Sequence, residues 1–483
     1  MIIKIRNDNR GILIRCLGVF IFAAASMAYW GGSCTPTPDS PLVAPEANGK
    51  FVLMFTGNWE GKLEPCGCTQ KQLGGIDRRS HIIRQTADNP ETRLMLDAGP
   101  LIEKQNRQAQ LKFETFLYSL RQLDYDAVNL TPNEIILLRE NLSLEPHQHS
   151  PVVCSNIPAD VREKLGVQEF LKKTLHNGRY SLDCLVFTLA DPAQLDNDFL
   201  AGKLQLQDPV SALKESLTAQ NISPDRPSKN KLVIVMLSAV NEPLTQELRA
   251  ITALDIVVTV GTTDEPGHYP GNDGQSLLIT TGKMGKYIVQ IDVPLVSIHA
   301  TDSYEFRSIA VESEFPKDPA ITGFINDYQT RLEMEDLIAD RSALPRELLE
   351  DGNSFLGNAS CNGCHRTGLY ERWQSLGHAH AMQTLQRVNR SYDPECVICH
   401  SVGMKYEGGY RSMQETPELA GVGCEMCHGP GAKHIEEPLD EYQTVFTTCE
   451  ECHTYEQSPP FYNRREKYFN NIQHWHGPRR YWP

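Results

Sequence analysis

Residues 361–365 read CNGCH, and the same pattern returns as CVICH at 396–400, CEMCH at 424–428 and CEECH at 449–453. Cys-x-x-Cys-His is the attachment site of c-type haem: both thiols form thioethers with the vinyl groups, and the adjacent histidine binds the iron. Zinc knuckles and redox-active dithiols are the alternative reading. Four copies within 93 residues, each with its histidine in the same place, favour haem.

The sequence therefore predicts four covalently bound c-type haems. The expected attachment residues are Cys361, Cys364, Cys396, Cys399, Cys424, Cys427, Cys449 and Cys452. The expected proximal ligands of the four irons are His365, His400, His428 and His453. Such a segment has few long apolar runs, so the haems are expected to supply much of its core.

Further histidines in the same segment are candidates for the sixth coordination position of the irons. They are His378, His380, His434, His474 and His476. These histidines form three clusters along the chain, whereas there are four motifs. One haem is therefore expected to be five-coordinate, or to be capped by Met404, by Met382 or by a histidine from elsewhere.

The segment from about 351 to 480 resembles a tetrahaem cytochrome c family, typified by the electron carrier of the hydroxylamine pathway in nitrifying bacteria. The resemblance is carried by WQSLGHAHAM (373–382), CVICHSVGM (396–404) and GVGCEMCHGPGAKH (421–434). It implies three haems with two histidine ligands each and one haem without a sixth protein ligand. It also implies that the distal ligands are His378 rather than His380, His434, and His474 rather than His476.

The segment 50–312 has a different pattern, in which apolar, β-branched runs alternate with helical stretches. The expected strands are 50–56, 92–99, 125–130, 151–157, 231–237 and 254–261. A helix is expected at 105–123, where Leu111, Phe116, Leu117, Leu120 and Leu123 recur at about helical spacing. This alternation predicts an α/β domain. Residues 313–350 are expected to form a helical connector that packs through Ile321, Phe324, Ile325 and Tyr328, followed by a mostly α, haem-cored domain at 351–483.

The α/β segment is similar to the calcineurin-like metallophosphatases of the exported 5′-nucleotidase type, which implies a sandwich fold. FTGNWEGKLEPCGC (55–68), LMLDAGPLI (94–102) and YDAVNLTPNE (125–134) carry the likeness. The residues at the expected metal-ligand positions are Asn58, Glu60, Pro100, Pro132, Asn133, Ala239, Thr262 and Asp264. Every imidazole and the bridging carboxylate are missing, so no catalytic dinuclear metal and no phosphatase activity are expected. Asp97 is expected to cap a turn; a hard cation held by Glu60, Asp97 and Asp264 is the alternative.

Four cysteines lie outside the haem motifs and the first 34 residues: Cys66, Cys68, Cys154 and Cys184. In an oxidising compartment they predict disulfides, with three connectivities open. A metal site at the EPCGC stretch (64–68) is the alternative.

The N-terminus carries basic residues and then an apolar run from 16 to 30, which is the pattern of an export signal at 1–33. Cleavage is expected after Ala28, or before a lipidated Cys34, and residues 34–49 are expected to form a flexible tether. The expected location is the periplasm or the outer cell surface. Loss of residues 1–33 removes four basic groups and one acid, which takes the formal charge from −15 to −18. That charge argues against nucleic acid as a partner and favours a basic protein partner.

The sequence favours an exported tetrahaem cytochrome that transfers electrons between protein partners, other cytochromes among them. In this interpretation the phosphatase-like domain is an inactive scaffold or docking module. The rival is a redox enzyme that acts on a small nitrogen compound at a five-coordinate haem. A weaker alternative is a nucleotidase-like metallophosphoesterase.

Overall fold

The computed structural model describes most of the chain from residue 49 onwards. The described ranges are 49–65, 72–86, 89–140, 151–195, 202–228, 230–271, 275–296, 298–340, 342–349, 352–365, 368–438 and 446–474. The predictions on the export signal at 1–33, on the tether at 34–49 except for its last residue, and on Cys34, Cys66, Cys68 and His476 lie outside these residues.

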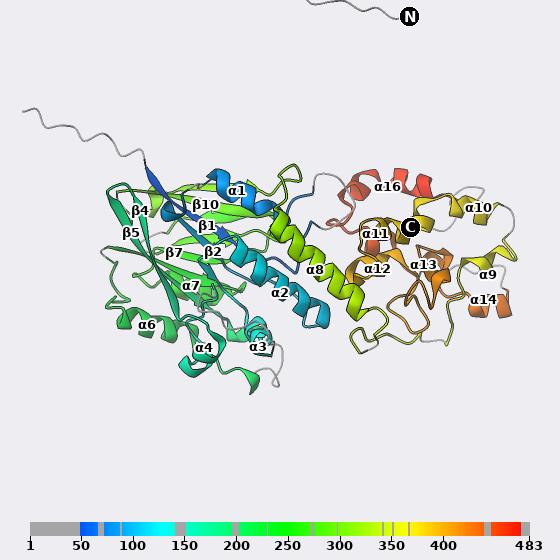
Figure 1. The fold of residues 1–483 in the computed structure, drawn as a ribbon, viewed down its shortest axis with the longest axis horizontal. Helices are drawn as coiled ribbons and strands as arrows, with labels where there is room; N and C mark the ends of the chain where they lie inside the picture. The colour runs from blue at the N-terminus through cyan, green and yellow to red at the C-terminus, as the bar shows by residue number, and fades with distance from the viewer. Residues whose placement is uncertain are drawn as a thin grey trace, which may run out of the picture. The chain divides into compact units, whose positions relative to one another are not determined.

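Two stacked β-sheets form the first part of the described chain (Figure 1). The first sheet has the order β11 (Glu305–Ala310), β10 (Tyr287–Pro294), β1 (Lys50–Thr56), β2 (Arg93–Asp97), β3 (Ala127–Val128). The second has the order β4 (Phe170–Asn177), β5 (Tyr180–Leu189), β6 (Lys231–Leu237), β7 (Ile256–Val260), β9 (Leu277–Thr281), β8 (Gly267–Tyr269). Neighbours from β1 to β3 and from β5 through β6 and β7 to β9 are parallel.

Both faces of the central strands are buried, which explains why they read as continuous apolar runs. In β1, Phe51, Leu53 and Phe55 point into the core between the two sheets, whereas Val52 and Met54 join the outer core. Strand β6 alternates in the same way, with Ile234 between the sheets and its neighbours under the helices of the other face. The domain is therefore a four-layered α/β sandwich, as predicted.

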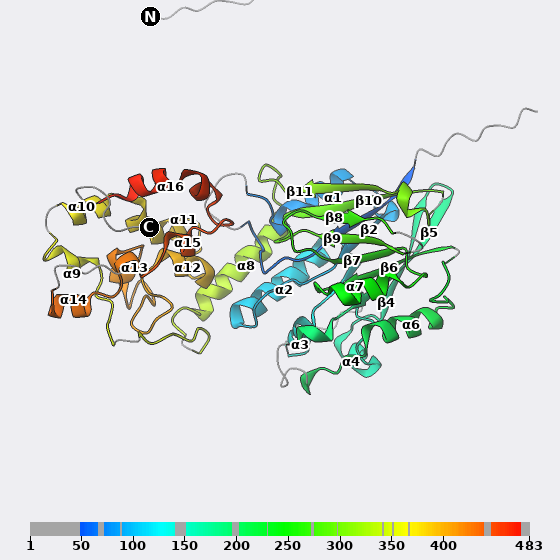
Figure 2. The ribbon, with the colours of Figure 1, turned by 180° about the vertical axis from the view of Figure 1, so that it is seen from behind.

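Helices cover both outer faces of the sandwich (Figures 1 and 2). On the first sheet lie α2 (Arg107–Gln122), α3 (Pro132–Glu140) and α8 (Pro319–Glu335); on the second lie α6 (Pro209–Ala219) and α7 (Glu242–Arg249). The remaining helices of this part are α1 (Arg79–Thr86) and α4 (Ala159–Leu165). The predicted connector helix is present as α8, which begins at the N-cap Asp318 and packs against α2.

The rest of the chain is built of short helices, as expected for a segment with few apolar runs. They are α9 (Asn358–Asn362), α10 (Leu369–Gln374), α11 (Ala381–Arg387), α12 (Pro394–His400), α13 (Cys424–His428), α14 (Ala432–Glu436), α15 (Cys449–Cys452) and α16 (Pro459–Ile472). Their core is one small cluster around Phe355, Val397 and Val402. Met382 and Met404 lie buried in the same cluster.

Two sequence predictions in the α/β part are wrong. Residues 151–157 form only isolated bridges, from Val152 to Val128 and from Val153 to Gln168, because the chain turns away after two residues. Cys154 and Cys184 are both buried and free, so neither takes part in the expected disulfides. Cys184 lies within β5, where its side chain fills the core between the sheets.

Candidate functional site

Each Cys-x-x-Cys-His motif lies on or at the end of a short helix. Helices α12 and α13 contain the second and third motifs entirely, α15 contains CEEC of the fourth, and α9 contains the first cysteine, Cys361. In a helix, residues i, i+3 and i+4 lie on one face. The two thiols and the histidine of a motif are thereby presented to the same side, where one macrocycle can meet all three.

Three proximal histidines lie opposite three of the predicted distal histidines. The ring centres are 6.4 Å apart for His365 and His434, 6.1 Å for His378 and His453, and 6.3 Å for His428 and His474. Each pair joins residues that are far apart in the sequence. The helices and turns around the motifs therefore bring these histidines together.

The spacing of these pairs fits a haem iron between the rings. An imidazole nitrogen lies about 2 Å from a bound metal ion and about 1 Å from its own ring centre, so two rings on opposite sides of one iron have centres about 6 Å apart. Burial, with smaller contributions from neighbouring histidines, lowers the pKa of His378 to about 4. Burial also lowers the pKa of His428. Both are therefore held as neutral imidazoles, the form that binds metal.

His400, the histidine of the second motif, has a different environment. Its Nδ1 lies 2.8 Å from the carbonyl oxygen of Ala381. A carbonyl oxygen only accepts, so Nδ1 carries the proton and Nε2 is left as the metal-binding nitrogen. Among the described residues, no histidine ring lies opposite it as in the three pairs.

The cysteines of different motifs also approach one another. The Cys361 thiol of the first motif lies close enough to Cys424 of the third to interact with it, and Cys399 of the second motif lies as close to Cys452 of the fourth. Cys427 of the third motif lies near enough to Cys449 of the fourth for their charges to interact. The motifs are therefore adjacent in the order first, third, fourth, second.

His380 differs from its neighbour His378, which it follows in the 3-10 turn Gly377–His380. His380 is exposed and lines an open pocket of about 710 Å³ together with Gln383, Gln386 and Arg387. No pairing with a proximal histidine ring is found for it among the described residues.

In the α/β domain, the loop after β1 is occupied by a buried network around Asp97. Its carboxylate accepts hydrogen bonds from the Thr56 hydroxyl, from Trp59 Nε1 at 2.8 Å and from Gly99 N at 2.9 Å. The last bond closes the turn that the sequence predicts. The Arg79 guanidinium lies 4.2 Å from the centre of the Trp59 ring. Burial raises the pKa of Asp97 in spite of these bonds.

Arg79 and Trp59 are residues of this site that the sequence did not identify. Both side chains are fully buried, and Arg79 donates to the carbonyl oxygen of Gly285. The stretch RRS (78–80), with two adjacent arginines, gives no signal that one of them is buried. The guanidinium and the indole place a buried cation and a bulky ring beside the loop after β1, where the resemblance of the sequence predicts metal ligands.

The residues at the positions where the resemblance predicts metal ligands are engaged elsewhere. Asn58 donates to the Gly261 carbonyl at 3.1 Å, and Asp264 pairs with Lys286 at 2.9 Å. Within the described ranges there is no cluster of three or more His, Cys, Asp or Glu side chains that could hold a metal ion. Glu60, Asp97 and Asp264 are all described, so the alternative prediction that they hold a hard cation together is wrong.

Comparison with protein families matches residues 360–429 to "Cytochrome c554 and c-prime". Cytochrome c-554 of Nitrosomonas europaea is 35% identical over 92 residues, which cover 16% of this chain and 39% of that protein. The chain thus spans about two fifths of the curated relative that it matches.

Two solved structures from Thermus thermophilus are similar to the chain. The 5′-nucleotidase precursor has 14% identity and a TM-score of 0.47, covering 70% of this chain and 68% of its own. The sulfate thiohydrolase SoxB has 13% identity and a TM-score of 0.47, covering 60% of this chain and 62% of its own. The matches show that the C-terminal part of this chain is similar to the cytochrome c554 family, and the stretch matched by the family, 360–429, contains the first three Cys-x-x-Cys-His motifs.

Proposed function

We propose that this protein is an exported tetrahaem c-type cytochrome that transfers electrons between protein partners. The observation that carries the proposal is the set of three histidine pairs, 6.1–6.4 Å between ring centres, next to motifs that attach haem covalently. The domain division that we propose is 50–312 for the α/β domain, 313–350 for the connector and 351–483 for the cytochrome domain.

The proposed ligand sets follow from the pairs. His365 with His434, His428 with His474, and His453 with His378 would each hold one iron from both sides. His400 would hold the remaining iron from one side only. The haems supply reversible one-electron chemistry when bound. The protein's part is to fix the orientation of each imidazole and to hold neighbouring motifs close together.

The adjacency of the motifs supports a path for electrons. Cysteines of the first and third, third and fourth, and fourth and second motifs lie side by side. The groups attached to these cysteines would therefore also be neighbours. Haem bound at the first and at the second motif would form the two ends of the series.

We further propose that the α/β domain has no phosphatase activity. Its former ligand positions hold residues such as Asn58 and Pro100, and Arg79 with Trp59 fills the adjacent loop region. A domain with this site can still serve as a scaffold, because its three cores are complete without a metal.

One set of measurements on the purified full-length protein tests these proposals. A haemochrome assay should give four haems per chain, and EPR should resolve three low-spin irons and one high-spin iron. Incubation with nucleotides and Mn²⁺ should release no phosphate. Fewer than four haems would contradict the cytochrome assignment, and phosphate release that Asp97→Ala abolishes would contradict the inactive domain.

The five-coordinate haem expected at His400 favours a second candidate, a redox enzyme acting on a small nitrogen compound. The two differ in a simple test: nitric oxide or hydroxylamine should change the high-spin EPR signal, and only an enzyme should turn the compound over.

Export is proposed from the sequence of residues 1–33. No helix in the described part of the chain is both long and apolar enough to cross a membrane. Mass spectrometry of the mature N-terminus should find cleavage after Ala28 or a lipid on Cys34.

A further inference from the structure

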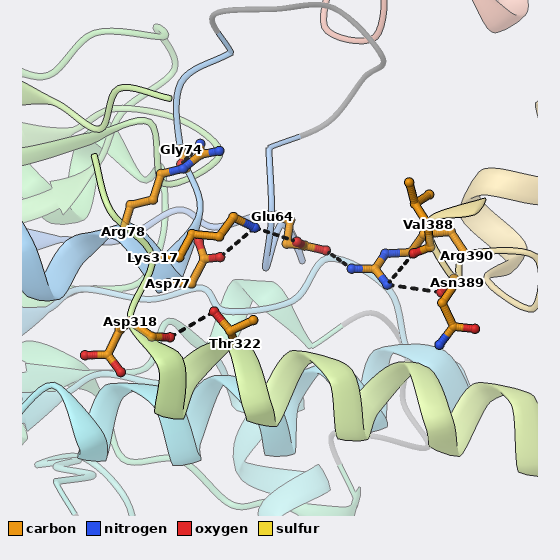
Figure 3. A network of polar contacts seen from close by, with 10 residues as sticks. All are labelled: Glu64, Gly74, Asp77, Arg78, Lys317, Asp318, Thr322, Val388, Asn389 and Arg390. Carbon is orange, nitrogen blue, oxygen red and sulfur yellow. Dashed lines mark hydrogen bonds and ion pairs between the residues drawn. The ribbon is translucent and has the colours of Figure 1, made fainter. Parts of the chain in front are cut away.

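Residues 388–395, which follow α11 and include the first two residues of α12, connect directly to the second haem motif and lie against the α/β domain. Tyr392 packs against the outer core of that domain. The Arg390 guanidinium pairs with Glu64, which stands in the loop after β1 (Figure 3). Arg390 also donates to the carbonyl oxygens of Val388 and Asn389. The segment is therefore joined to a second domain just before the helix that carries the motif.

The pairing of Arg390 extends deep into the α/β domain. Figure 3 shows Lys317 between two carboxylates, with its Nζ 3.3 Å from Glu64 and 2.9 Å from the fully buried Asp77. Lys317 immediately precedes the N-cap of α8, Asp318. Glu64 is thus fixed by cations on both sides. The pKa of Glu64 is lowered, because the cations Arg390 and Lys317 outweigh the effect of burial, which alone would raise it.

Asp393 is held by uncharged amides from two helices of the α/β part. Its Oδ1 accepts from Gln108 Nε2 of α2 at 2.7 Å, and its Oδ2 accepts from Gln329 Nε2 of α8 at 3.2 Å. All three side chains are at least 94% buried. Asp393 is also the N-cap of α12, where its side chain accepts from Glu395 N at 3.0 Å. The carboxylate that begins α12 is therefore satisfied largely by residues outside the cytochrome domain.

Glu395 adds a charged contact next to the first attachment cysteine of the motif, Cys396. Its Oε1 lies 2.8 Å from Lys112 Nζ of α2, and its Oε2 lies 3.8 Å from Lys62 Nζ. Lys112 is 6% exposed. Burial of an ammonium group is costly unless a carboxylate compensates it, so this pair constrains both helices.

We propose that the α/β domain and the connector helix α8 together form a clamp that positions the second haem motif and sets the redox potential of the haem bound there. The clamp consists of Gln108, Lys112 and Gln329. They act on Asp393 and Glu395, and through α12 on His400. This inference rests on the proposed function, because it concerns the haem that lacks a second histidine. It assigns a role in the electron-transfer site to a domain that has lost the ligands of a metallophosphatase.

The charges predict the sign of the effect. The pair of Lys112 and Glu395 is close to neutral at the attachment point of the haem. Removing Lys112 makes the local charge more negative by one unit even though Lys62 remains near Glu395, which stabilises the ferric over the ferrous iron and lowers the potential. Without the charge of Glu395, the excess would be positive and the potential would rise.

The test compares Lys112→Met, Glu395→Gln and Gln108→Ala in the full-length holoprotein. A potentiometric titration followed by EPR reports the high-spin haem separately from the low-spin haems. Lys112→Met should lower the ratio of reduced to oxidised high-spin haem at a fixed potential several-fold, and Glu395→Gln should raise it. A tenfold change would correspond to about 59 mV for a one-electron couple. Gln108→Ala should lower the ratio as well, because Asp393 loses a donor.

Two further variants serve as controls. Lys112→Arg keeps the charge and should restore the wild-type potential. Arg107→Ala removes the ion pair between Arg107 of α2 and Glu335 of α8, whose charged atoms lie 2.7 Å apart. This ion pair does not involve the 388–395 segment, so the variant should leave all potentials unchanged. These two variants separate an effect of the clamp from a general loosening of the helices.

The proposal is overturned if the high-spin potential is the same in all variants, or if the low-spin haems shift by as much as the high-spin one. It is also overturned if Lys112→Met and Glu395→Gln shift the potential in the same direction. If Lys112→Met does not fold, the uncharged change at Gln108 and the change at Glu395 still decide the matter. A protein that keeps four redox-active haems in these experiments retains the proposed function whichever way the clamp is decided.

Discussion

Replacing His434 by alanine is expected to turn one low-spin haem into a high-spin haem without loss of the haem itself. The ring of His434 lies 6.4 Å from that of His365, whose motif would keep the macrocycle attached through Cys361 and Cys364. Alanine cannot reach across this distance. His428 lies close enough to His365 for the two rings to interact electrostatically, but the ring of His428 is already paired with that of His474.

The size of the effect follows from the number of pairs. With three pairs and one unpaired motif, one haem in four should be high-spin in the wild type, and two in four in His434→Ala. EPR spin quantitation and the high-spin charge-transfer band report this doubling, and the haemochrome assay should still give four haems. His380→Ala, which changes an exposed histidine of the same segment, is the matched control and should leave the spin states as they are. An unchanged high-spin share in His434→Ala, or a doubled share in His380→Ala, would refute the assignment of the pairs.

Three further predictions concern stability. Asp97→Ala should destabilise the α/β domain by about 3–5 kcal/mol in urea denaturation, because the buried Arg79 loses its nearby carboxylate. Burial raises the pKa of Glu134 from 4.5 to about 7, so the folded state binds this proton more tightly than the unfolded state. The stability that the protonated Glu134 contributes is therefore present below pH 4.5 and is lost as the pH rises towards 7. The wild type should lose about 3 kcal/mol over this window relative to Glu134→Gln, as measured by unfolding at pH 4.5 and pH 8. Gly403→Ala should cost about 1–3 kcal/mol, seen as a lower melting temperature of the cytochrome domain, because a Cβ there would meet the Phe355 ring at 2.4 Å.

The central strands of the α/β sandwich were predictable because burial on both faces leaves a continuous apolar run in the sequence. Strand β6 has the predicted bounds, 231–237. The β4–β5 hairpin was missed, since β4 is an edge strand with polar residues such as Lys172 and Lys173. The Asn177–Gly178 dipeptide between the two strands is a hairpin turn signal that would have revealed it.

The haem motifs were predictable because each is local, and the short helices that carry them need only a few residues. The partner of each proximal histidine was not predictable from spacing alone, because the pairs join turns and helices separated by tens of residues. The contacts of Gln108 with Asp393 and of Lys112 with Glu395 could not be predicted from any pattern in the sequence. Gln108 and Lys112 lie on a helix whose apolar spacing the sequence displays, and a polar residue on such a helix is ordinarily read as solvent-exposed.

The loop GNWEGKLE, at 57–64, contains both the candidate ligand positions Asn58 and Glu60 and the contact residues Lys62 and Glu64. Asn58 near its start donates to the Gly261 carbonyl, whereas its last residues reach the segment before the second haem motif through Lys62 and Glu64. The start of the loop is therefore held within the α/β domain while its end contacts the cytochrome domain. Introducing metal-ligand side chains by Asn58→Asp and Glu60→His is not expected to create a metal site, because Arg79 and Trp59 are buried beside the turn at Asp97.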